Sequence, residues 1–158
     1  MLKIRKAKIE DIAQLNVLFK DIDQFHYNAL PEVFRKPKDP VRPESYLRKL
    51  IIDVNSLLLV AEEDRKIIGL VHAFVREPSE VPIFVKKKFV FIDNIVVKDE
   101  YQRKGVGSAL MKKIEDWSRK EEACFIELNV WEFNKKAKRF YRKLGYHTIS
   151  IKMRKEIK

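Results

Sequence analysis

Two glycines, Gly105 and Gly107, stand beside Arg103 and Lys104 at the expected start of a helix. The chain has four glycines, and this short stretch uses two of them. Glycine permits a tight turn and lets a ligand approach the backbone closely. The first N–H groups of a helix have no partner inside it, and the helix dipole favours an anion there. The stretch predicts a phosphate-binding turn, with a glycine turn needed only for packing as the alternative.

Two common phosphate-binding motifs do not fit this turn. The segment "GVGSAL" lacks both the four-residue gap between glycines and the Lys-Ser/Thr pair of a P-loop. A dinucleotide fingerprint would need a third glycine, or an alanine, where Leu110 stands. The phosphate site is therefore expected to be of another kind.

Hydrophobic periodicity predicts the elements that would position the turn. Strands are expected over residues 2–7, 56–64, 66–77, 88–97, 124–131 and 146–157. Helices are expected over residues 9–25, 44–51, 105–120 and 134–145. The run 88–97 is almost continuously apolar, which is typical of a central strand, and the passage from it through the helix to residue 131 predicts a parallel crossover. The expected fold class is α/β with a mixed, partly parallel α+β sheet flanked by helices.

Composition narrows the classes of protein. The chain has 158 residues, 46% of them hydrophobic, and is expected to form one domain over residues 1–158. No apolar run is long enough for a membrane span, and Cys124 is the only cysteine, which excludes a disulfide framework and a cysteine-based metal site. A cytoplasmic protein without a metal is expected. The net charge of +11 admits a nucleic acid as partner, but the positive residues are spread along the chain and indicate a solvated basic surface.

The context of the turn indicates a family. "QRKGVG" fits Gln/Arg-x-x-Gly-x-Gly/Ala, follows an apolar strand and opens an amphipathic helix; about 27 residues later comes "NKKAKRFYRKLGY". With these paired motifs the chain resembles the GNAT superfamily of N-acetyltransferases, most strongly over residues 89–146. One departure is Asp99, where the family often has proline.

The resemblance implies a site for acetyl-CoA. Its pyrophosphate would lie on the amides of residues 103–108, and residues 95–97 would offer their backbone to the pantetheine arm where two strands splay apart. Asn134 would hydrogen-bond the pantetheine, and Tyr141 would donate a proton to the leaving thiolate. The alternatives are a helix cap for Asn134 and a core aromatic for Tyr141. The expected acetyl-CoA contacts are Ile95, Val96, Val97, Gln102, Arg103, Lys104, Gly105, Val106, Gly107, Ser108 and Asn134.

The acceptor side is less defined. Asp93 lies near where related enzymes often carry a carboxylate base, with a surface acid as the alternative. His72 alternates with apolar residues on its strand and is a second candidate, with a plain core or surface histidine as the alternative. By resemblance, Phe25, His26 and Tyr27 would border the acceptor pocket.

The expected function is transfer of the acetyl group of acetyl-CoA to a primary amine in a ternary complex, without a metal. The acceptor stays open among small amines, polyamines, amino acid derivatives, antibiotics and protein N-termini. The alternatives are a catalytically inactive CoA-binding or sensor module and a basic nucleic-acid-binding protein. No membrane partner is expected, and a homodimer is compatible with the sequence.

Overall fold

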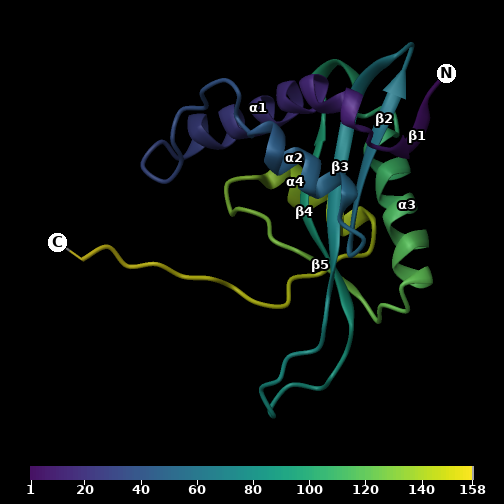
Figure 1. Cartoon of the computed structure of the whole chain (residues 1–158). Helices are drawn as coiled ribbons and strands as arrows, with labels where there is room; N and C mark the ends of the chain where they lie inside the picture. Colours follow the sequence, from purple (N-terminus) through teal and green to yellow (C-terminus); the bar gives the residue numbers. More distant parts are fainter. Residues whose placement is uncertain (158) are drawn as a thin grey trace.

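A mixed five-stranded sheet organises the computed structural model, which describes residues 1–157 (Figure 1). The strands lie in the order β1-β2-β3-β4-β5, all antiparallel to their neighbours except β4 and β5, which are parallel. The strands are β1 (Lys3–Lys6), β2 (Ser56–Glu63), β3 (Lys66–Arg76), β4 (Phe89–Val97) and β5 (Ile126–Leu128). The helices are α1 (Ile12–Ala29), α2 (Glu44–Ile52), α3 (Val106–Lys120) and α4 (Lys135–Lys143), with 3-10 turns η1 (Ile9–Asp11) and η2 (Asp99–Tyr101). The predicted fold class is confirmed.

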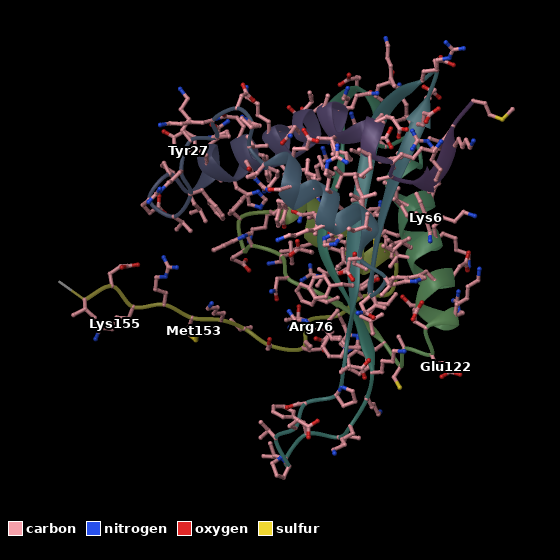
Figure 2. All side chains as sticks on the ribbon, viewed as in Figure 1. Lys6, Tyr27, Arg76, Glu122, Met153 and Lys155 are labelled. Carbon is pink, nitrogen blue, oxygen red and sulfur yellow. The ribbon has the colours of Figure 1, made fainter. Side chains whose placement is uncertain are left out.

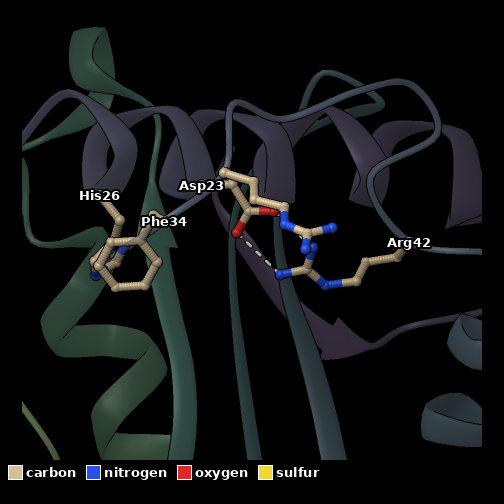
Figure 3. Close-up of a pocket in the computed structure, with 5 residues that line it drawn as sticks. Asp23, His26, Phe34 and Arg42 are labelled. Carbon is tan, nitrogen blue, oxygen red and sulfur yellow. Dashed lines mark hydrogen bonds and ion pairs between the residues drawn. The ribbon is translucent and has the colours of Figure 1, made fainter. Parts of the chain in front are cut away.

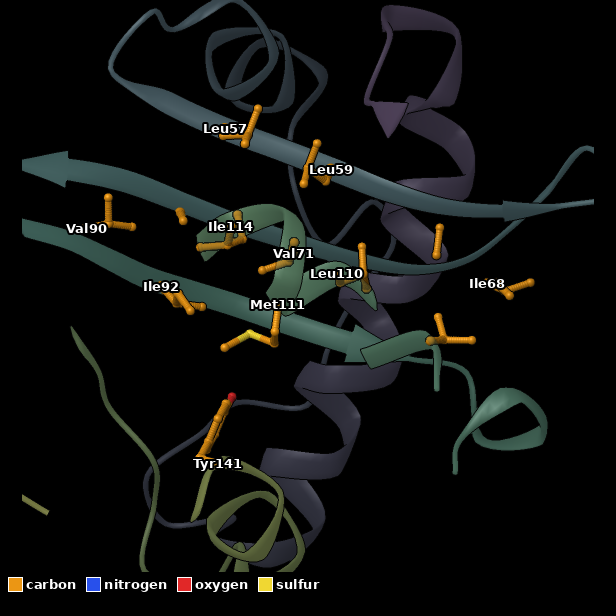
Figure 4. Packing of buried hydrophobic residues seen from close by; sticks show 13 residues of the cluster. Leu57, Leu59, Ile68, Val71, Val90, Ile92, Leu110, Met111, Ile114 and Tyr141 are labelled. Carbon is orange, nitrogen blue, oxygen red and sulfur yellow. The ribbon is translucent and has the colours of Figure 1, made fainter. Parts of the chain in front are cut away.

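Each face of the sheet carries its own hydrophobic core. α1 and α2 cover one face, where Leu15, Phe19 and Leu47 pack against Val60 and Leu70. α3 and α4 cover the other face (Figure 4), and its buried residues include Leu57, Leu59, Val71, Val90, Ile92, Leu110, Met111, Ile114 and Tyr141. The apolar stripe of α3 follows the 3.6-residue period of a helix that buries one face. The central strands are covered on both faces, as their apolar runs predict.

β4 carries an irregularity at Asp93. His72 of β3 pairs with Asn94, and the next residue, Ala73, pairs with Ile92, so Asp93 is the extra residue of a β-bulge. On its other side β4 pairs with β5 only over residues 90–92. Beyond the bulge, β4 continues to Val97 with β3 as its only paired neighbour among the described residues. The expected splaying of the sheet is thus confirmed, and it begins at the bulge.

One strand prediction is wrong and another is too long. Residues 146–157 form no strand: Ile149, Ile151 and Met153 are 68%, 81% and 88% exposed, and the segment runs away from the sheet, with Met153 and Lys155 clear of the other elements (Figures 1 and 2). Residues 124–131 form only the short β5. The alternation of side chains is present in both segments, but a strand also needs a neighbour to receive its backbone hydrogen bonds.

Among the described residues, no helix combines the length and apolar character needed to cross a membrane.

Candidate active site

The turn before α3 has the backbone that the glycine pattern predicts. Gly105 caps the helix in the left-handed conformation, with φ of 84°, and Arg103 is also left-handed, with φ of 60°. A Cβ atom built on Gly105 would meet nothing within 4 Å, so the space beside the turn is open. A Cβ on Gly107 would lie 3.2 Å from Cζ of Phe140, so this glycine lets α4 pack closely on α3. Gly105 is therefore favoured by its backbone conformation, whereas Gly107 is favoured by close packing between two helices.

The side chains of the turn divide into bonded and exposed groups. Gln102 Nε2 donates to the carbonyl oxygen of Val97 and to Oδ1 of Asp99, both at 2.8 Å, and its Oε1 accepts from Lys136. Gln102 thus links the end of β4 to α4, with Asp99 as part of the link. The predicted residues Arg103, Lys104 and Ser108 are exposed and lie in sequence next to the first N–H groups of α3, which have no acceptor within the helix.

The end of β4 borders the gap that the bulge opens. Ile95, Val96 and Val97 pair with β3. Their backbone groups that face away from β3 have no ladder partner in β5, which ends at Leu128. An extended ligand with amide groups could pair with such an edge, because N–H and C=O groups away from water require partners. The edge and the open turn are consecutive along the chain, so one long ligand could contact both.

α4 brings the second motif to the far side of the gap. Asn134 caps the helix, and its Oδ1 accepts a hydrogen bond of 3.0 Å from the N–H of Ala137. Tyr141 packs into the core beneath α3 at 9% exposure, and Figure 4 shows its hydroxyl end directed toward Met111. Burial, together with the neighbouring Tyr146, raises the pKa of Tyr141 well above its ordinary value, because the charged phenolate is disfavoured away from water. Tyr141 is therefore a protonated phenol at neutral pH.

The bulge places two predicted residues together. Oδ2 of Asp93 lies 3.5 Å from Nδ1 of His72, an ion-pair distance that is long for a hydrogen bond, and accepts a hydrogen bond of 2.7 Å from Asn94. His72 is buried, and neither ring nitrogen has a hydrogen-bond partner among the described residues. The contact with His72 lowers the pKa of Asp93 more than burial raises it, and Arg42 acts in the same direction. Asp93 is therefore an ionised carboxylate beside an imidazole whose ring nitrogens have no hydrogen-bond partner among the described residues.

A pocket of about 300 Å³ lies on the α1 side of the sheet (Figure 3). In this pocket the two terminal nitrogens of Arg42 donate hydrogen bonds of 2.6 and 2.9 Å to the carboxylate of Asp23. The rings of His26 and Phe34 lie 5.1 Å apart at its other side. The lining residues are Asp23, His26, Phe34, Arg35 and Arg42.

Aromatic contacts connect this pocket to the segment after β5. Phe34 lies 5.1 Å from Trp131, and Phe133 lies 5.9 Å from His26 and 5.7 Å from Phe25, measured between ring centroids. The pocket thus adjoins the segment between β5 and α4, which begins where β5 stops pairing with β4. Phe25 and His26 are brought to this cluster.

Other site residues depart from the sequence reasoning. Tyr27 is half-buried at the outer end of α1 (Figure 2) and makes none of these ring contacts. Sequence reasoning missed Asp23, Phe34, Arg35 and Arg42. Asp23 looks like any acid on a helix surface, and the other three lie on a proline-rich loop whose path no periodicity predicts.

Comparison with known proteins gives a family match. A model described as the acetyltransferase (GNAT) family matches residues 20–146, which include the turn, β4, α3 and α4. The uncharacterized N-acetyltransferase YhfO of Bacillus subtilis is 27% identical over 145 residues, 92% of this chain and 89% of that protein. An N-alpha-acetyltransferase of Sulfurisphaera tokodaii is 26% identical over 157 residues, 94% of this chain and 82% of that protein.

Solved structures share the fold. A mutant of the BH1408 protein from Bacillus halodurans superposes with a TM-score of 0.93 at 24% identity, covering 98% of this chain and 99% of that one. The aminoglycoside 6'-N-acetyltransferase AAC(6')-Ih from Acinetobacter baumannii superposes with a TM-score of 0.76 at 19% identity, covering 100% of both chains. At these identities the likeness shows a shared fold.

Proposed function

The chain belongs to the GNAT family of acetyltransferases, and from this premise we propose that it transfers the acetyl group of acetyl-CoA directly to a primary amine held in a ternary complex. One observation carries the proposal: β5 leaves β4 at the Asp93 bulge. The departure leaves a free backbone edge that begins next to the acid–imidazole pair and leads to the open turn before α3. A cofactor bound at the turn would therefore extend along this edge toward the Asp93–His72 pair.

The residues present fit acetyl-CoA as a substrate. The amides of Val106, Gly107 and Ser108 would hold its pyrophosphate, with Arg103 and Lys104 adding positive charge. Open space at Gly105 supports this placement, since a side chain there would occupy the approach to the amides. The backbone of residues 95–97 would pair with the pantetheine amides. Acetyl-CoA supplies the acetyl group as a thioester.

The Asp93–His72 pair fits the proton transfer at the amine. An amine must lose its extra proton before its nitrogen can attack the thioester carbon. The ionised Asp93 would bind the ammonium form, and the pair would take up the released proton on His72, with the carboxylate stabilising the imidazolium. Histidine is the side chain class suited to this step near neutral pH.

Tyr141 fits the proton transfer at sulfur. Its phenol is protonated at neutral pH and could donate a proton as the carbon–sulfur bond breaks, and burial, which raises its pKa, makes it a weaker acid than an exposed tyrosine. Solvent would then return a proton to the phenolate. Asn134 contributes by capping α4, which carries Tyr141.

Acetyl-CoA binding and amine-dependent release of CoA test the function. At about 100 times its dissociation constant, acetyl-CoA should stabilise the native state by about 2.7 kcal/mol, which is a rise of about 5–11 °C in Tm for a chain of this size. Thiol release should then depend on an added primary amine. An unchanged Tm would contradict the function. A raised Tm without transfer to any amine would favour the CoA-binding module instead.

A further inference from the structure

The pocket lies on the same side of the sheet as the Asp93–His72 pair. His72 pairs with Leu58 of β2, and Leu58 belongs to the core between the sheet and α1, the helix that carries the pocket residues Asp23 and His26. Asp93 lies 3.5 Å from His72, and the charge of Arg42 also lowers the pKa of Asp93. Arg42 lies 5.0 Å from the ring centroid of Phe19 on α1 and also lines the pocket. An amine bound at Asp93 would therefore extend the rest of its molecule past Arg42 into the pocket.

The charges that line this pocket are mainly positive. Its acid, Asp23, is held by both terminal nitrogens of Arg42 and is therefore not free to bind a cation. Arg35 is exposed and has neither an ion pair nor a hydrogen bond with any residue in the range 1–157. Besides the rings of His26 and Phe34, one acidic and two basic side chains line the pocket. An unpaired arginine at the end of a pocket fits an incoming carboxylate, since the guanidinium fork matches carboxylate geometry.

From these charges we propose that the acceptor is an amine that also carries a carboxylate. The amine would lie at Asp93, the carboxylate would pair with Arg35 beside Arg42, and the rings of His26 and Phe34 would contact the carbon skeleton between them. The inference rests on the proposed acetyl transfer and names its substrate class. A polyamine or an aminoglycoside would bring further positive charge against both arginines, which like-charge repulsion disfavours.

Matched amine triplets test the inference. Each triplet contains an α- or ω-amino acid, its primary amide, and the diamine of the same length, and kcat/KM is measured by CoA release. We expect kcat/KM for the amino acid to exceed that for its amide by more than about tenfold, because the amide cannot form the charge-assisted pair with Arg35. The diamine should have the lowest kcat/KM, because its second ammonium group is repelled by the arginines.

Arg35 variants identify the origin of that preference. Arg35→Gln should raise KM for the amino acid about tenfold and leave KM for its amide unchanged, and Arg35→Glu should reverse the order of amino acid and diamine. Lys38→Gln is the control, since Lys38 is an exposed base on the same loop that does not line the pocket. Acetyl-CoA should raise the Tm of all three variants as it does that of the wild type.

The outcomes separate the two proposals. If acetyl-CoA leaves Tm unchanged and no amine is acetylated, the acetyl transfer itself fails. If acetyl-CoA binds but amides or diamines match the amino acids, or no amino acid is acetylated, the transfer proposal can stand and the carboxylate inference is overturned. An equal loss with every acceptor in Arg35→Gln would also overturn it.

Discussion

Gly105 holds a backbone conformation that an L side chain rarely adopts, and it does so at the mouth of α3. Gly107, two positions along, has an ordinary φ but lies against the ring of Phe140. The first position is constrained by its φ and has open space, and the second is constrained by space alone. Only at Gly105 would a new side chain project into the volume proposed for the pyrophosphate.

Replacing Gly105 tests this distinction. Gly105→Val should lower the free energy of unfolding by about 1–2 kcal/mol through left-handed strain, and should weaken acetyl-CoA binding by more than tenfold through blocked access. Unfolding by denaturant and calorimetric titration give the two values. Ser108→Ala is the matched control, because the proposed contact uses its amide and not its hydroxyl. Unchanged acetyl-CoA affinity in folded Gly105→Val would show that the turn serves packing only.

Tyr141 combines a packing role with a proposed chemical one. Tyr141→Phe keeps the buried ring and removes only the hydroxyl, so stability should change little. If the hydroxyl protonates the departing thiolate, single-turnover acetyl transfer should slow by about 10²-fold, with acetyl-CoA affinity nearly intact. Tyr146→Phe, on the ring that contacts Tyr141, is the control and should not slow the transfer. A variant with wild-type single-turnover rates would exclude Tyr141 as the acid.

Among the elements, β1, β2 and the first helical turn are joined by one arginine. Arg5 donates to both carboxylate oxygens of Asp11 at 2.7 and 2.9 Å and to Glu62 at 2.5 Å. The N–H of Lys8 adds a bond of 2.7 Å to Asp11. Burial by itself would raise the pKa of Asp11, but these hydrogen bonds outweigh it and the pKa is lowered. The ion pair therefore fixes the edge strand β1 to the start of α1.

Asp11→Asn should break this junction. Asn lacks the charge of Asp11, so the charge-assisted hydrogen bonds from Arg5 are weakened while Arg5 keeps its pairing with Glu62. The free energy of unfolding at pH 7 should fall by about 1.5–3 kcal/mol. Because the pKa of Asp11 is lower in the folded state, its contribution is present above the unfolded pKa of about 3.9 and is lost as pH falls through the folded pKa.

Denaturant unfolding across pH checks both points. The difference between wild type and Asp11→Asn should be largest near pH 7 and should shrink below about pH 4. Glu10→Gln is the control, since Glu10 is exposed and adjacent, and it should change stability by less than about 0.5 kcal/mol. A difference that does not vary with pH would mean that the Asp11 charge does not stabilise the junction.

At the scale of the whole molecule, the C-terminal segment contributes little to the fold. Tyr146 packs on the core, but residues 147–157 are exposed and belong to no helix or strand. Exposed chain without buried contacts adds little to stability. The apolar side chains of this segment, those of Ile149, Ile151, Met153 and Ile157, are all largely exposed to water.

Deleting residues 149–158 tests this description. The truncated chain should unfold with a free energy within about 0.5 kcal/mol of the full chain and keep its acetyl-CoA-dependent rise in Tm. A full-length double variant, Ile149→Ser with Ile151→Ser, should show the same free energy of unfolding and the same rise in Tm as the truncated chain. A loss of several kcal/mol would mean that the segment pairs with a sheet edge in solution. Sedimentation of the full chain would then tell whether that edge belongs to the same copy or to a second one.

Local patterns in the sequence carry much of this structure. The helical stripe of Leu110 and Ile114, the apolar run of β4 and the glycine turn at Gly105 were predictable, because each depends on neighbours a few residues away. The paired motifs around Gly105 and Tyr141 indicate the family for the same reason. Interactions between residues close in the sequence thus determine the main helices, most strands and the turn that is proposed to bind acetyl-CoA.

Contacts between segments far apart in the sequence could be identified only from the folded structure. The bulge at Asp93 exists because β3 pairs on either side of it, and the Asp23–Arg42 pair forms because a proline-rich loop returns to α1. Residues 146–157 have a strand pattern without a strand, since strand formation depends on a partner that their own sequence does not specify. Strand pairing and the charge of the pocket depend on residues far apart in the sequence, and for that reason the proposed acceptor site could be identified only from the tertiary structure.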